Sequence, residues 1–229
     1  MNGEPLPYLL RTDSVVVFAL FFCIILVAYI LLDNKKYLSY KFKDLLASRE
    51  RNSRYIDVTA DSMHYSFLLI LHACVLWGIC IYSYLIDHST ESFRLFSPYL
   101  LLGLICCFIV FVLLKSFLQS VVNWVFFDKM RNANWIKTYY NIYIWSGLLL
   151  LPIVLLVVLG NLSLNIFSYW ICLVVIIMKI VLFFNCFNNF FKNFHGCFHL
   201  ILYLCALEIL PDVLLWKSIW VTNHFLLQL

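Results

Sequence analysis

The chain has 229 residues, of which 64% are hydrophobic and only 12% are charged, and its formal net charge is +4. Soluble domains average about 45–50% apolar and about 25% charged residues, so a soluble globular protein is excluded. The apolar runs are continuous rather than alternating, which excludes a transmembrane β-barrel. The composition therefore predicts an all-α, polytopic transmembrane helical bundle that forms a single domain over residues 1–229.

The predicted spans are stretches of about 20 mostly apolar residues, the length that crosses a bilayer. No cleavable signal sequence is visible, so we expect the first apolar run to remain as a span. The longest run, Thr138–Met178, is too long for one span, and the polar segment Asn161–Asn165 divides it into two. Six spans are expected, at residues 14–32, 62–86, 95–114 (with a continuation to 127), 138–159, 166–190 and 197–220.

Lysine and arginine are distributed unequally between the predicted connections. The positive-inside rule places the side that is richer in these residues in the cytoplasm. With six spans, both termini are then predicted to lie outside. Eleven of the 16 basic residues fall on the cytoplasmic side: Lys35, Lys36, Lys41, Lys43, Arg49, Arg51, Arg54, Lys129, Arg131, Lys137 and Lys192.

The first cytoplasmic connection, residues 33–61, is the only long polar segment. Leu38, Phe42, Leu45 and Leu46 recur at helical spacing within it, and most of the basic residues lie off that face. This pattern predicts an amphipathic helix that binds the membrane surface through its apolar face and through attraction to anionic lipid. The alternative is a connection that packs under the bundle.

The third span continues beyond the length that a bilayer requires. Lys115, Gln119 and Asn123 recur every four residues along this continuation and form a polar stripe on one helix face. We favour a long, tilted helix whose stripe faces the bundle over a helix that bends onto the inner surface. In either arrangement Lys115 could extend its ammonium group to the inner interface.

Lys179 and Glu208 each interrupt an apolar run on consecutive, antiparallel spans. A charge near the bilayer midplane costs about 2.5–3.5 kcal/mol on insertion scales, so it usually faces the protein interior and has a partner. We therefore predict that the two side chains lie within interaction distance, with Lys115 as a rival partner. Pro211 predicts a kink one turn beyond Glu208, which is either an ordinary membrane kink or part of an ion or proton site.

Motifs for cofactors, metals and catalysis are weak. His195 and His199 have the i, i+4 spacing of a metal clamp, but no carboxylate accompanies them, so they are weak metal candidates. No phosphate-binding, dinucleotide-binding or nucleophile motif is present, and the basic connection lacks the size of a nucleic-acid-binding module. No cofactor, no nucleic acid and no catalytic residue is expected, and an enzyme is disfavoured.

The segment Leu202–Pro211, LYLCALEILP, resembles a signature of a bacterial inner-membrane family from Bacteroidota that is known only as a domain of unknown function. In that family a tyrosine–leucine–cysteine run leads to a glutamate and a proline. The resemblance covers most of the chain, but only this motif is specific. It implies a multi-pass protein of the cell inner membrane and no mechanism. The matching residues here are Tyr203, Leu204, Cys205, Glu208 and Pro211, followed by Lys217.

Three functions remain compatible with these features. The first is a structural or assembly partner of other envelope proteins, because the loops are too short to fold as catalytic domains. The second is a small ion- or proton-coupled carrier that uses Glu208 and Lys179. The third is a lipid-handling membrane enzyme that uses His195, His199 or Glu208. The expected partners are the lipid bilayer and other membrane proteins, and a water-filled cavity that reaches Glu208 would favour the carrier.

Overall fold

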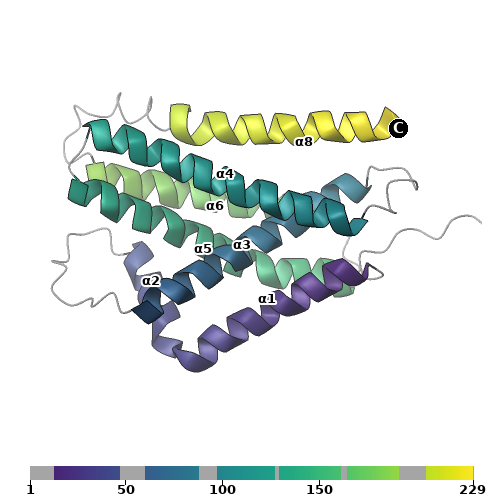
Figure 1. The fold of residues 1–229 in the computed structure, drawn as a ribbon, viewed down its shortest axis with the longest axis horizontal. Coiled ribbons are helices and arrows are strands. Elements are labelled where there is room, and N and C mark those ends of the chain that lie inside the picture. The colour runs from purple at the N-terminus through teal and green to yellow at the C-terminus, as the bar shows by residue number, and fades with distance from the viewer. Residues whose placement is uncertain are drawn as a thin grey trace, which may run out of the picture.

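The structure is a computed structural model that describes residues 13–46, 60–87, 97–126, 129–160, 164–190 and 205–228. These residues form helices and no strand, so the predicted all-α bundle is confirmed. Figure 1 shows the long helices crossing the molecule back and forth. In chain order the elements are α1 (Ser14–Asp33), α2 (Lys35–Leu46), α3 (Ala60–Asp87), α4 (Ser97–Phe126), α5 (Lys129–Gly160), α6 (Leu164–Phe190), the π-helix η4 (Cys205–Ile209) and α8 (Leu210–Gln228).

Five of the described helices, α1, α3, α4, α5 and α6, are long and apolar enough to cross a membrane. They correspond to the first five predicted spans, although α5 begins at Lys129, earlier than expected. The sixth span stays a prediction, because residues 197–204 lie outside the described residues and α8 is not among the five. α8 nevertheless runs alongside the bundle, and its C-terminal end lies at the same end of the molecule as the start of α1 (Figure 1).

α3 is the central helix of the bundle. In its apolar window 72% of the residues are buried, against 28% for α1 and α4 and 17% for α6. It packs against α1, α4 and α5. Gly147 of α5 approaches α3 so closely that an added Cβ atom would lie 2.6 Å from the Cβ of Ala73. Small residues at such crossings let membrane helices approach each other, so this contact fixes how α3 and α5 pack.

The predicted amphipathic helix is present as α2 and lies against the bundle. The Tyr37 side chain is buried, and its hydroxyl bonds to that of Ser66 on α3. Asn141 on α5 donates to the backbone carbonyl of Lys41 over 2.9 Å. Phe42 packs its ring on Trp145 at 5.0 Å between centroids. Helix α2 therefore packs against α3 and α5, as the alternative prediction for this connection stated. Binding to the membrane surface stays a prediction, which helix gain by a peptide of residues 35–51 on anionic vesicles would test.

The orientation in the membrane is a testable prediction, since it depends on loop charges alone. Cysteines engineered at Ser53 and Ser89, both outside the described residues, are expected to report opposite sides of the membrane. In intact spheroplasts of a cysteine-free background, an impermeant thiol reagent should label position 89 and not position 53. Labelling of position 53 alone would show that the predicted orientation is inverted.

Candidate functional site

The polar stripe of α4 faces the bundle interior. Helix α4 continues without interruption over 30 residues. Lys115, Gln119 and Asn123 are all buried on it, with exposed fractions of 2%, 0% and 0%. The prediction of a long third helix with an inward stripe is confirmed. Lys115 does not reach the inner interface, because carboxylates on another helix hold its ammonium group inside the bundle.

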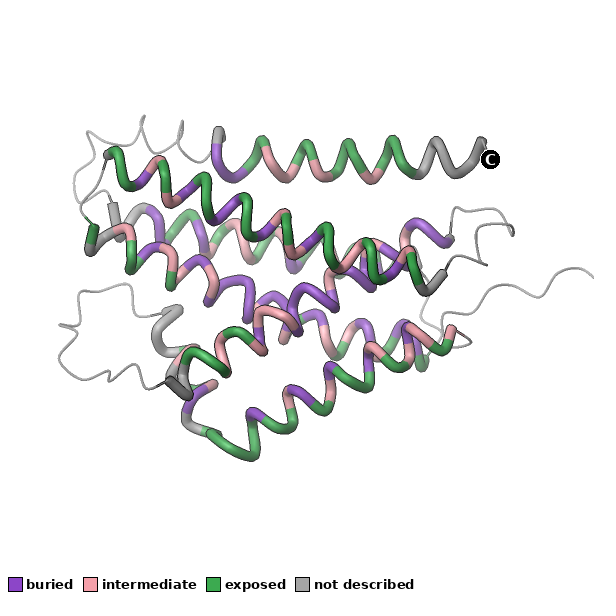
Figure 2. Tube along the Cα trace, viewed as in Figure 1, coloured by how far each residue is buried: buried purple, intermediate pink, exposed green. Residues whose placement is uncertain are grey.

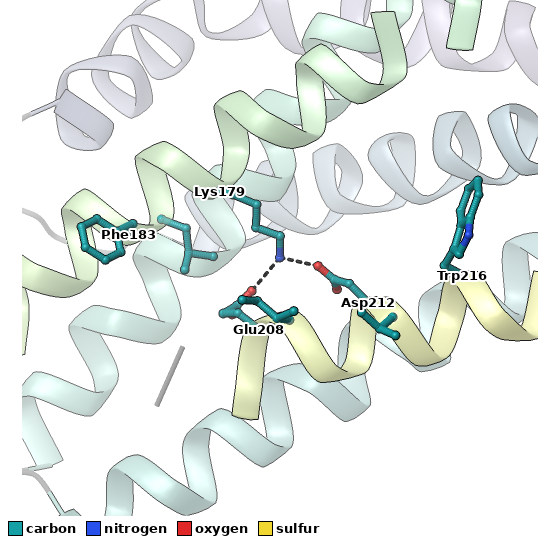
Figure 3. Close-up of a pocket in the computed structure, with 8 residues that line it drawn as sticks. Lys179, Phe183, Glu208, Asp212 and Trp216 are labelled. Carbon is teal, nitrogen blue, oxygen red and sulfur yellow. Dashed lines mark hydrogen bonds and ion pairs between the residues drawn. The ribbon is translucent and has the colours of Figure 1, made fainter. Parts of the chain in front are cut away.

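Four charged side chains, one each from α4, α6, η4 and α8, form a closed ring in which positive and negative charges alternate. The Lys115 ammonium on α4 lies 2.8 Å from Glu208 Oε2 and 2.8 Å from Asp212 Oδ1. The Lys179 ammonium on α6 lies 3.0 Å from Glu208 Oε2 and also pairs with Asp212 Oδ2. Figure 3 shows Lys179 reaching both carboxylates. The predicted pair of Lys179 and Glu208 is therefore present, and the ring also includes Lys115, the predicted rival.

The ring connects to a buried polar network on α4 and α5. Gln119 donates from Nε2 to Glu208 Oε1, and its own carbonyl oxygen accepts from the Trp135 indole over 3.3 Å. The Trp135 side chain is fully buried. On the same helix, the Tyr139 hydroxyl donates to that of Tyr143 over 3.1 Å. The Gln119 bond holds the Glu208 carboxylate in one orientation, because both of its oxygens are engaged.

The local helix geometry of η4 and α8 places the two carboxylates together. Glu208 and Asp212 are four residues apart, so they lie on the same helix face. Pro211 lacks a backbone N–H and cannot continue the regular bonding pattern, and the turn before it, η4, is a π-helix. The irregular turn therefore includes Glu208 itself rather than following it by one turn. Such single π-turns occur frequently at functional sites.

A cavity of about 450 Å³ opens between α6 and α8 and reaches the ring. Lys179 and Asp212 form the edge of the ring at this cavity, with 35% and 34% of their side chains exposed. Lys115 and Glu208 lie behind them and are 1% and 2% exposed. The cavity is lined by Lys179, Leu182, Phe183, Glu208, Ile209, Asp212, Val213 and Trp216.

The exposed edge of the ring lies well within the length of the apolar segment of α6. Lys179 is seven residues before Cys186, the last residue of the apolar segment of α6, which is about 10 Å along the helix axis. Hydrocarbon would be a poor cover for a charged pair at that depth, at about 2.5–3.5 kcal/mol per charge. The cavity therefore suits water or a ligand with a polar group.

Helix α8 has few contacts with the other helices that the structure describes. Figure 2 shows that most of its described residues are exposed. Among the described residues, it approaches other helices through η4 and the charged ring, through Leu215, which packs against the core cluster around Trp135 and Tyr139, and through Trp216, whose ring lies 6.0 Å from that of Tyr84 on α3. The ion pairs are thus a principal attachment of α8 to the bundle.

Comparison with protein families settles the classification of the chain. The family model described as domain of unknown function DUF4271 matches residues 16–219. The chain belongs to the DUF4271 family. No curated protein and no solved structure matches it. The resemblance inferred from residues 202–211 is confirmed to the extent that the family is a domain of unknown function.

The remaining predicted residues of this DUF4271 protein are only partly covered by the structure. His195, His199 and Tyr203 lie outside the described residues. Cys205 belongs to η4, and Pro211 is half-buried at the start of α8. Within the described ranges, no group of three side chains could hold a metal ion.

Sequence reasoning missed the role of Asp212 in this DUF4271 protein. The sequence places Asp212 on the same helix face as Glu208, four residues later, but Asp212 was not included among the expected site residues. A second unexpected group is His72 on α3, which is fully buried and has no hydrogen-bond partner for either ring nitrogen among the described residues. Trp135 and Tyr139 belong to an aromatic cluster at the start of the fourth predicted span that is typical of a membrane interface, whereas the structure buries both side chains fully.

Proposed function

We propose that this membrane protein is a small proton-coupled carrier of the cell inner membrane, with Lys115, Glu208, Lys179 and Asp212 as its ion-handling site. The observation that carries the proposal is the cavity that reaches this charged ring. Buried ionisable residues that face a cavity within a membrane bundle are typical of substrate and proton pathways. The π-turn that contains Glu208 resembles the broken helices that line transporter sites.

Protonation of the ring would change the position of α8, and the reason is electrostatic. With all four groups ionised, its two positive and two negative charges cancel. A proton on either carboxylate leaves one ammonium charge uncompensated and weakens the ion pairs that hold α8 to α4 and α6. Because most of the described residues of α8 are exposed, protonation would favour a second position of this helix. A proton thus acts as a ligand that shifts a conformational equilibrium.

The proposal is tested by proton flux into proteoliposomes that contain a trapped pH indicator. After an external acid step, with valinomycin and potassium to compensate charge, wild-type protein should admit protons faster than empty liposomes. Glu208→Gln should reduce that excess rate at least tenfold, because it leaves one ammonium charge of the ring uncompensated before any proton arrives and so removes the proton-dependent change. Asp33→Asn, which removes an exposed carboxylate at the end of α1, is the matched control and should keep the wild-type rate.

A folding defect is separated from a loss of function by a second variant. Lys179→Met combined with Glu208→Gln removes one ion pair and keeps the net charge, so its thermal stability in detergent should recover relative to Glu208→Gln. The flux should stay absent in this double variant. A wild-type flux in Glu208→Gln, or no flux above empty liposomes for the wild type, would contradict the carrier.

An assembly role with other envelope proteins is the second candidate. It is favoured by the exposed apolar side chains of α8, which include Leu214 and Trp220. A partner helix seated there would remain bound in mild detergent. Cross-linking from photoreactive residues at positions 214 and 220 to a stoichiometric second protein in intact cells would support this role, and cross-links to lipid alone would argue against it.

A further inference from the structure

We infer that the cavity between α6 and α8 takes an amphiphilic monocarboxylate, whose carboxylate binds the Lys179 ammonium while Asp212 takes up one proton from the aqueous phase. This inference rests on the proposed carrier function and names its class of substrate. It follows from three features of the cavity: its unused hydrogen-bonding capacity, its apolar walls and the charge sum of the ring.

The first feature decides the sign of the ligand. A lysine ammonium has three N–H donors, and the contacts of Lys179 use two of them, to Glu208 and Asp212. Within the part of the chain that the structure describes, the third donor has no partner, so it is available at the cavity for a carboxylate oxygen. A cationic ligand at Asp212 would instead lie beside two ammonium groups, because Asp212 Oδ1 already pairs with Lys115 and Oδ2 with Lys179.

The second feature is the apolar wall of the cavity. Leu182 and Phe183 on α6, with Val213 and Trp216 on α8, surround the charged edge. Phe183, Val213 and Trp216 are themselves exposed on the outer face of the bundle, so the cavity is open toward the side of the molecule. A volume of about 450 Å³ has room for roughly 15 groups the size of a water molecule. A carboxylate with an alkyl or aryl tail fits both the charge and the walls, and it can enter from the lipid.

The third feature couples binding to a proton. The ring is neutral, so an added carboxylate gives a net negative charge inside the bundle unless a proton accompanies it. Asp212 is the carboxyl that takes this proton, because about a third of its side chain is exposed at the cavity whereas Glu208 is enclosed. The proton forms one O–H bond on Asp212, and no other bond is made or broken. Among the described residues, the titratable and charged groups that face Asp212 are Lys115 from α4, Lys179 from α6, Glu208 from η4 and, at longer range, Tyr139 and Tyr143 from α5.

The test uses the whole protein in nanodiscs of zwitterionic lipid, with octanoate as the probe and tryptophan fluorescence as the readout. Octanoate should quench the fluorescence saturably, and Trp216→Phe should remove most of the change. Octanol and octyltrimethylammonium should bind at least tenfold more weakly than octanoate. Octanoate affinity should rise about tenfold for each pH unit of acidification, and in a weakly buffered solution about one proton should be taken up per octanoate bound.

Variants assign these effects to residues. Lys179→Gln should weaken octanoate binding at least tenfold, whereas Lys137→Gln, at an exposed position of α5, should bind as wild type does. Asp212→Asn should still bind octanoate but with no proton uptake, a result that loss of folding cannot produce. Binding without proton uptake in the wild type, or equal binding of the three probes, would overturn the inference. Failure of octanoate to bind while the proton flux persists would overturn the substrate class and leave the carrier function standing.

Discussion

Replacement of Lys115 by methionine is expected to lower the free energy of unfolding by about 3–5 kcal/mol, the usual effect of removing one partner from a buried ion pair. The Lys115 side chain is 1% exposed and neutralises Glu208 and Asp212 together. Without it, two carboxylates share the single ammonium of Lys179, and one negative charge in the bundle is uncompensated. Thermal or denaturant unfolding in mild detergent measures the loss. Lys137→Met, at an exposed position, is the control and should change stability by less than about 0.5 kcal/mol.

A double variant distinguishes the ring from simple loss of a side chain. Lys115→Met with Asp212→Asn restores charge balance and leaves Glu208 paired with Lys179 and bonded to Gln119. Its stability should recover by about 1–3 kcal/mol relative to Lys115→Met alone, since residues in one ion-pair network are coupled. If the two single losses simply add, the four groups do not act as one network.

Substitution of Gly147 by alanine is expected to lower the free energy of unfolding by about 1–3 kcal/mol, because the added methyl group overpacks the contact between α3 and α5. The new Cβ atom would lie 2.6 Å from Ala73 Cβ and 2.7 Å from Ala73 Cα, which is backbone and can yield only by moving α3. The α3–α5 contact is central to the bundle, so that movement would spread to the buried core. Unfolding in mild detergent would show the loss directly.

Two other glycines serve as matched controls for Gly147. Gly103→Ala on α4 meets no atom within 4 Å and should be neutral or raise stability by up to about 1 kcal/mol, because alanine is the better helix former. Gly78→Ala meets Cγ1 of the Ile105 side chain at 2.6 Å, whereas the Ile105 backbone lies no closer than 3.4 Å, so its effect should fall between the two. An equal effect at all three positions would mean that helix propensity, and not the close approach of α3 and α5, governs stability.

The class and most of the layout of this protein could be predicted from its sequence, because they depend on local properties. A span is defined by the apolarity of about 20 consecutive residues, and five of the predicted spans correspond to helices. The inward stripe of Lys115, Gln119 and Asn123 follows from helical periodicity alone. The pairing of Lys179 with Glu208 was predictable because an isolated charge in an apolar run needs a partner at the same depth.

Only the tertiary structure decided how these groups combine. The closure of the ring by Asp212 depends on the rotation of α8 about its axis and on the π-turn that sets its register, and no short segment of sequence specifies either. The packing of α2 on α5, the close approach of Gly147 to Ala73 and the cavity beside the ring all join residues that are far apart in the chain. The sequence by itself determined which residues must be buried and which charges must be paired, since hydropathy and helical period act locally. The partners of each charge, and the opening of the ring to a cavity, were decided by the relative rotation and depth of packed helices.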